Sequence, residues 1–142
     1  MKILLAVDGS ENAVRATRNL AEASPLYKQA PEVELVTVQP RVLSVGLARA
    51  IVSQDMIDRY YLQEGEKALA PSKQVLDTAG IRNSPHALVG EVAQAIVEHA
   101  RNSGCDMIYM GTRGMSAISS ALLGSIAIKV LHLARVPVVL VQ

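Results

Sequence analysis

Residues 106–125 read DMIYMGTRGMSAISSALLGS and hold the most informative pattern of the sequence. It opens with an apolar segment at 106–110 that is typical of a buried strand. Gly111 and Gly114 follow, then nine residues, and then Gly124 and Ser125 at the start of a segment with helical spacing. A strand, a glycine-rich connection and a helix in this order are typical of parallel α/β proteins that bind a ligand at the start of the helix.

Four other apolar segments predict strands, at residues 3–7, 33–38, 86–89 and 136–141. Helical spacing predicts helices after Ser10, which can cap the first one, and over 55–79, 91–102 and 125–134. Pro71 is expected to kink or restart the second helix, because proline lacks the amide donor, and Gly80 is expected to end it. Residues 40–54 give a weak signal and are interpreted as a loop or partial helix.

Strands that alternate with helices predict an α/β fold, a doubly wound five-stranded parallel sheet with helices on both faces. We expect one Rossmann-like domain over residues 1–142, with strand order 3-2-1-4-5. Ligands of such sheets bind at the carboxyl ends of strands where the winding direction reverses. The loops after the first and fourth strands, at Asp8 and Gly111, are therefore the candidates.

Composition limits the remaining possibilities. Half of the 142 residues are hydrophobic, only 3% are aromatic and Trp and Phe are absent, so the core is expected to consist of Val, Ile, Leu and Ala. The net charge of +1 gives no field for nucleic acid or an anionic membrane. Cys105 is the single cysteine and is interpreted as a small buried hydrophobe. With no bilayer-length apolar segment and no signal peptide, a cytoplasmic protein is expected.

The glycine pattern suits an anion. Glycines let the backbone approach a phosphate closely and adopt positive φ, and the amides of a helix start point toward it. Ser125 can donate its hydroxyl as well as cap the helix. The alternative is an ordinary loop that ends in a helix start. No Gly-Lys-Ser/Thr and no obvious general base is present, so no catalytic residue is assigned and hydrolysis should be slow at most.

The complete pattern, G-x2-G-x9-G-S, resembles the ATP-binding signature of the universal stress protein family. The resemblance continues along the chain in residues 3–10 (ILLAVDGS), 88–100 (LVGEVAQAIVEHA), 106–111 (DMIYMG) and 137–141 (PVVLV). It implies a small stress or signalling module that binds ATP together with Mg²⁺ or Mn²⁺.

The resemblance also implies residue roles. It places Asp8 near the ribose and bound metal and Val38 against adenine, largely through its backbone. The ribose and phosphates would be held by Gly111, Arg113 and Gly114, and the distal phosphates by Gly124 and Ser125, with Ile126 where the family often has valine. Ala127 departs from the pattern, because ATP-binding members often carry Ser or Thr there.

Several residues have simpler interpretations. Asp8 could be only a turn residue and Arg113 only a solvated loop charge. Met110 and Met115 flank the loop, and filling core gaps is the simpler role for both. The histidines at 86, 99 and 132 share no motif spacing, so no metal site is expected from them.

Two other functions compete with ATP binding. A homodimeric interaction protein with an empty glycine loop is favoured by Ala127. A dinucleotide oxidoreductase is disfavoured, because no GxGxxG follows Val7.

The last strand predicts the oligomeric state. It is apolar at every position from Val136 to Val141, and Pro137 favours a place at the sheet edge. An unprotected apolar edge invites pairing with another chain. We therefore expect a homodimer in which two such strands pair across a twofold axis.

Overall fold

The computed structural model describes residues 1–41, 53–114 and 123–142. Its strands are β1 (Lys2–Ala6), β2 (Glu32–Gln39), β3 (Asn83–Val89), β4 (Met107–Gly111) and β5 (Val138–Val141). They pair in parallel in the order β3-β2-β1-β4-β5. The predicted fold class and strand order are thus confirmed.

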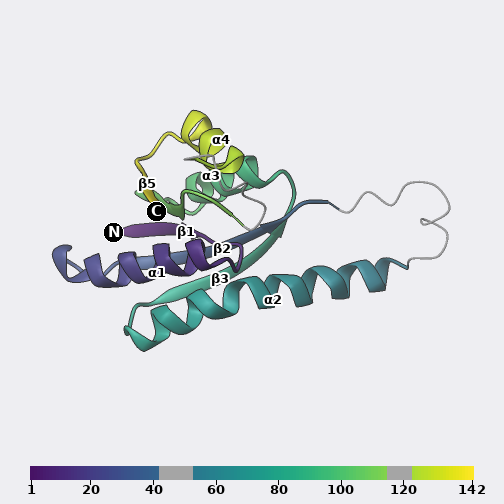
Figure 1. Ribbon diagram of the computed structural model, residues 1–142, viewed down its shortest axis with the longest axis horizontal. Coiled ribbons are helices and arrows are strands. Elements are labelled where there is room, and N and C mark those ends of the chain that lie inside the picture. Colours follow the sequence, from purple (N-terminus) through teal and green to yellow (C-terminus); the bar gives the residue numbers. More distant parts are fainter. Residues whose placement is uncertain (42–52, 115–122) are drawn as a thin grey trace.

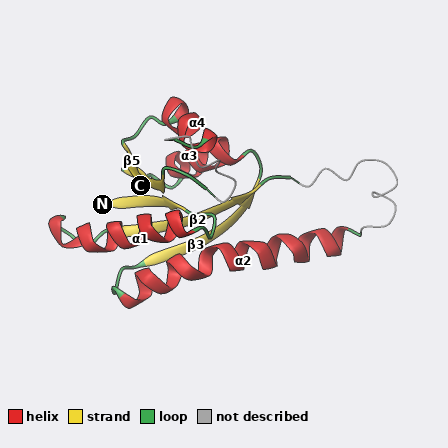
Figure 2. Ribbon diagram, viewed as in Figure 1, coloured by secondary structure: helices red, strands yellow, loops and turns green. Residues whose placement is uncertain are grey.

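Helices cover both faces of this sheet (Figures 1 and 2). They are α1 (Glu11–Ala23), α2 (Gln54–Thr78), α3 (Val92–Asn102) and α4 (Ser125–Leu133), with a short 3-10 turn at Ser24–Leu26. Ser10 caps α1 as predicted, because its side chain accepts from the Ala13 amide at 3.2 Å. None of the described helices combines the length and the apolar character that a bilayer span requires.

The core forms two aliphatic layers, one on each face of the sheet. Alternation along β1 sends Ile3 and Leu5 toward α1 and α2, and Leu4 and Ala6 toward α3 and α4. Cys105 is buried in the second layer, as expected for a small hydrophobe. Strand β1 is therefore covered on both sides, which explains why residues 3–7 are continuously apolar.

Two strands begin two or more residues away from their predicted starts, and the other boundaries agree to within one residue. β3 begins at Asn83 rather than at residue 86, because its ladder with β2 continues through Pro85 to the pair Val33–Asn83. Proline is tolerated there because β3 lies at a sheet edge. β5 begins at Val138, directly after Pro137, although the Pro137 carbonyl still accepts from the Ile108 amide at 2.9 Å.

Helix α2 runs unbroken through Pro71, so the predicted restart is wrong. The next residue, Ser72, is fully buried and accepts a 2.8 Å hydrogen bond from the Thr17 hydroxyl of α1. This contact holds α2 against its neighbour where proline removes a helical hydrogen bond. Gly80 follows the helix with a φ of 69°, as predicted for its end.

Residues 40–54, whose sequence pattern gave only a weak signal, are described only in part, because residues 42–52 lie outside the described residues. Met115, in the connection after β4, also lies outside them. Pro40 and Arg41 belong to no helix or strand. Ser53 caps α2, and its side chain accepts from the Met56 amide at 3.3 Å.

Candidate functional site

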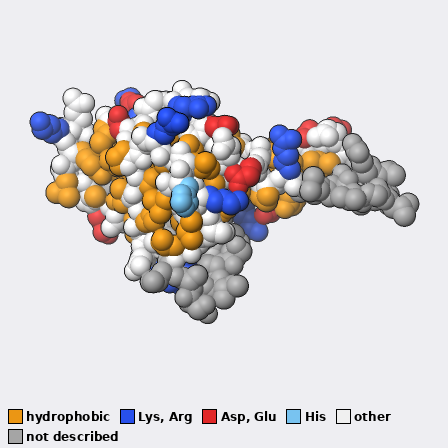
Figure 3. Space-filling view, turned by 90° about the horizontal axis from the view of Figure 1, so that it is seen from above, with side chains coloured by type: hydrophobic (Ala, Val, Ile, Leu, Met, Phe, Trp, Pro, Cys, Tyr) orange, Lys and Arg blue, Asp and Glu red, His pale blue; other side chains and the backbone are white. Residues whose placement is uncertain are grey.

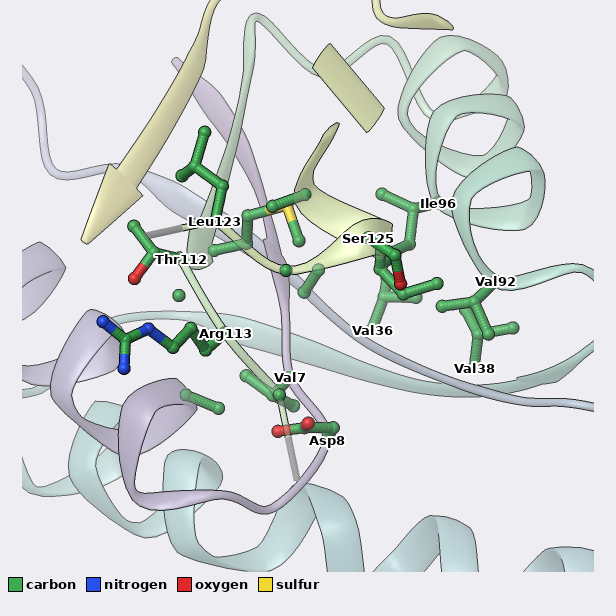
Figure 4. Close-up of a pocket in the computed structure, with 18 of the residues that line it drawn as sticks. Val7, Asp8, Val36, Val38, Val92, Ile96, Thr112, Arg113, Leu123 and Ser125 are labelled. Carbon is green, nitrogen blue, oxygen red and sulfur yellow. The ribbon is translucent and has the colours of Figure 1, made fainter. Parts of the chain in front are cut away.

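A cavity of about 590 Å³ opens at the carboxyl ends of β1, β2 and β4, next to the starts of α3 and α4 (Figure 4). Its volume is in the range of small-molecule sites. The order of the strands reverses between β1 and β4, so the cavity lies at the predicted switch point. All eight residues predicted for the site line it: Asp8, Val38, Gly111, Arg113, Gly114, Gly124, Ser125 and Ile126.

One end of the cavity is apolar. Val36 and Val38 of β2 face Val92 and Ile96 of α3 across it, as Figure 4 shows. Of these four residues, only Val38 is among those predicted from the sequence. The others could have been recognised from spacing, because residues two apart on a strand and four apart on a helix share a face.

The backbone of Val38 is directed into the same region. The Val36 carbonyl accepts from the Val7 amide at 2.8 Å, so it points toward β1. Val38 is two residues further along β2 and directs its backbone groups to the same side. There β1 has already ended, at Ala6. A planar ligand between Val38 and α3 could therefore reach a backbone donor and acceptor.

The other end is polar and starts at Asp8. One Asp8 carboxylate oxygen accepts from the Ser10 amide at 3.0 Å, so the residue does shape the turn after β1. Its second oxygen, Oδ2, lies where a Cβ on Gly114 would approach to 2.5 Å. The loops after β1 and β4 thus meet closely, and a side chain at position 114 would displace the carboxylate.

The start of α4 closes the polar end. The Gly124 amide donates to the Thr112 carbonyl at 2.7 Å, which fixes the helix start to the end of β4. Gly124 is the cap residue and provides no side-chain hydrogen bond. The prediction that Ser125 caps the helix is therefore wrong: Ser125 is the first helical residue, and its exposed side chain lines the cavity.

Positive φ, one of the two reasons predicted for the glycines of this connection, is wrong. Among the described residues, positive φ occurs at Gly9, Gly80 and Gly104. It occurs at none of the glycines between β4 and α4, which are Gly111, Gly114 and Gly124. Close approach explains them instead. A Cβ on Gly111 would lie 3.2 Å from the backbone of Asn12, and one on Gly124 would lie 3.3 Å from the Thr112 carbonyl oxygen.

Ala127 belongs to two environments. It lines the cavity and is also 2% exposed within the core layer under α3 and α4. Met110 has the same double position, so it both fills the core and lines the site.

A second polar cluster was not predicted. Glu34, His86 and His99 come together between the sheet and α3, while His132 is exposed on α4. Burial alone would raise the pKa of Glu34, but hydrogen bonds from His99 and Lys2 and the charge of His86 outweigh it and hold the pKa below its ordinary value. Motif spacing could not reveal this cluster, because strand register brings it together.

The sequence as a whole agrees with one family. The model of the universal stress protein family matches residues 1–142. The chain belongs to this family. A universal stress protein from Methanocaldococcus jannaschii is 32% identical to it over 142 residues, which cover 99% of this chain and 81% of the relative.

Solved structures extend the comparison for this universal stress protein. Hypothetical protein MJ0577, the subject of a structure-based assignment of biochemical function, superposes with a TM-score of 0.82 at 26% identity, over 99% of this chain and 94% of that one. The universal stress protein from Archaeoglobus fulgidus in complex with dAMP has a TM-score of 0.67, also at 26% identity, over 100% and 98% of the two chains.

Proposed function

We propose that this universal stress protein binds ATP and serves as a small nucleotide-dependent module in signalling or the stress response. The observation that carries the proposal is the cavity at the switch point, which has an apolar end and a glycine-rich end. A nucleotide has the same division, with an apolar base and an anionic phosphate chain. The relative that binds dAMP supports a nucleoside phosphate as the ligand class.

The adenine ring would occupy the apolar end. Val92 and Ile96 of α3 offer it a packing surface, and the Val38 backbone offers hydrogen bonds at its edge. Backbone groups of fixed direction can select one base, because a donor and an acceptor must both be matched.

The phosphates would lie at the other end. There the first amides of α4 and its dipole favour negative charge, and the Ser125 hydroxyl and the half-buried Arg113 add donors. Gly111 and Gly114 keep the adjoining wall free of side chains. Arg113 and Ser125 lie at opposite ends of the connection between β4 and α4, which supports a chain of phosphates over a single phosphate.

Mg²⁺ or Mn²⁺ would accompany the triphosphate. Both ions prefer oxygen ligands, and Asp8 supplies a carboxylate at the polar end. Glycine at position 114 lets this carboxylate keep its place in the wall, because a Cβ there would come within 2.5 Å of Asp8 Oδ2. When bound, the metal would neutralise part of the phosphate charge.

Binding is proposed in place of rapid turnover. Among the described residues that line the cavity, Asp8 and Arg113 are the ionisable ones. Arg113 cannot accept a proton from water, and Asp8 Oδ1 already accepts from the Ser10 amide. The chain therefore offers little general-base assistance to hydrolysis.

The proposal is tested by denaturing freshly purified protein and identifying the released small molecules by mass spectrometry. We expect an adenine nucleotide, with ATP as the main species. Protein that releases none, and that gains none after incubation with ATP and Mg²⁺, would support the alternative of an interaction protein with an empty loop.

We also propose a homodimer formed through β5. This strand is at the sheet edge, and its carbonyls at Pro137 and Val141 accept from β4. Val138 and Leu140 alternate with them and direct their backbone groups outward. The adjoining helix α4 exposes Ile128, Leu131 and Leu133, and Figure 3 shows hydrophobic side chains gathered on this face. Pairing two copies through β5 would cover this edge.

The outward amide of Val138 provides a selective test. Val138→Pro removes that donor and leaves the β4–β5 hydrogen bonds in place, whereas Val138→Thr keeps the amide and serves as the control. Light scattering should give a dimer for the wild type and Val138→Thr, and a weaker dimer for Val138→Pro. A wild-type monomer at micromolar concentration would contradict the proposal. Val139→Glu is less informative, because Val139 also packs against the core.

A further inference from the structure

Three side chains that commonly bind metals meet on the sheet face under α3. Glu34 comes from β2, His86 from the neighbouring strand β3, and His99 from the last turn of α3. Glu34 and Val36 point to the same side of β2, and Val36 pairs with His86, so register places the imidazole next to the carboxylate. Three separate elements therefore bring their ligand atoms to one point.

The spacing of these atoms suits a metal ion. Glu34 Oε2 lies 2.7 Å from His86 Nε2 and 3.2 Å from His99 Nε2. All three ligand atoms are within 4.8 Å of one another. Around tetrahedral zinc, with bonds of about 2.0–2.2 Å, ligand atoms are separated by about 3.3–3.6 Å. Small side-chain adjustments bring the cluster to that spacing.

His86 gives an independent indication of a missing ligand. Its Nε2 atom is buried and has no hydrogen-bond partner among the described residues, although the Glu34 carboxylate is near. Buried polar atoms of native proteins normally have a partner, and an ion is one explanation for an exception. A metal ion between the three ligand atoms would satisfy the nitrogen of His86 directly.

The surroundings determine which metal fits. Two imidazoles and one carboxylate suit zinc, whereas Mg²⁺ and Ca²⁺ prefer oxygen ligands alone. The side chains of Glu34 and His99 are 12% and 17% exposed, and that of His86 is 36% exposed. His86 is thus the most exposed of the three side chains, although its Nε2 atom is buried.

Lys2 has two opposing effects. Its ammonium lies 3.2 Å from the other carboxylate oxygen, Glu34 Oε1, and so orients Oε2 toward the histidines. Its positive charge also repels a cation and reduces affinity.

We propose that Glu34, His86 and His99 form a zinc-binding site that is separate from the nucleotide cavity.

Zinc titration of chelator-treated, nucleotide-free protein tests the proposal. We expect one zinc per chain in calorimetry, and at least tenfold weaker binding in His86→Gln and in His99→Gln. His132→Gln is the matched control and should bind as the wild type does.

A measurement on the unaltered chain keeps the test independent of how well the variants fold. NMR of the imidazole groups during zinc addition should show changes at His86 and His99 and none at His132. The proposal is overturned if zinc leaves these two signals unchanged. It is also overturned if His132→Gln loses zinc binding.

Discussion

At the scale of single residues, the site depends on side chains that are small. Gly111 and Gly124 allow backbone segments from different parts of the chain to approach one another, and Gly114 allows the Asp8 carboxylate to lie close to it. Local spacing was enough to predict these glycines and Asp8. It could not give their physical reason, because the neighbours they accommodate, such as Asn12 and Thr112, are set by the tertiary structure.

Ala127 allows a gain of affinity to be predicted. Ala127→Ser adds one hydroxyl at the cavity wall, and we expect ATP binding to tighten by up to about tenfold, the scale of one good hydrogen bond. Ile128→Ser is the control, since Ile128 is exposed and does not line the cavity. Calorimetry measures both; equal affinity for Ala127→Ser and the wild type would show that this side chain does not reach the ligand.

Cys105 should be unreactive in the folded chain. Burial, followed by the nearby Glu34 charge, raises the pKa of its thiol from 9.0 to about 11. At pH 8 the reactive thiolate fraction is therefore about a hundredfold lower than at the ordinary pKa. Alkylation followed by mass spectrometry should be slow for native protein and fast in urea. Equal rates would contradict the burial of this thiol.

The same pKa shift affects stability at high pH. A raised pKa in the folded state stabilises the fold fully below pH 9.0. That contribution is lost as the pH rises through about 11, because the unfolded chain ionises first. The unfolding free energy should fall over this range, and it should fall less in Cys105→Ala.

At the scale of elements, apolar runs and helical periodicity predicted every strand and α-helix that the structure describes, but neither the 3-10 turn after α1 nor all of the boundaries. β3 extends through Pro85 because its partner strand continues, and α2 passes Pro71 because packing at Ser72 supports it. Both outcomes depend on neighbouring elements. The cluster around Glu34 depends on strand register for the same reason.

Gly65 tests how closely α2 approaches the sheet. A Cβ at this position would lie 2.6 Å from the Ala87 Cβ of β3. Gly65→Ala should gain about 1 kcal/mol of helix propensity but lose more through overpacking, for a net loss of about 1–2 kcal/mol. Urea unfolding measures this change. The double variant with Ala87→Gly should recover part of the loss, and a more stable Gly65→Ala would contradict the close contact.

At the scale of the whole molecule, the sheet order brings the loops after β1 and β4 together and creates the cavity between them. The sequence predicted this arrangement because alternating strands and helices restrict the topology strongly. Its apolar end was only partly predicted, since α3 contributes side chains that also resemble ordinary core residues. The central claim is that this cavity binds ATP.

Calorimetric titration with ATP and Mg²⁺ tests that claim most directly, with two alanine variants as a matched pair. In Gly114→Ala the new Cβ displaces Asp8 Oδ2, whereas in Gly90→Ala it meets only the Ala95 side chain at 4.0 Å, outside the cavity. We predict one ATP per chain for the wild type and Gly90→Ala, and at least tenfold weaker binding for Gly114→Ala. A wild-type protein that shows no saturable ATP binding, or a Gly114→Ala variant that binds as tightly as Gly90→Ala, would contradict the account.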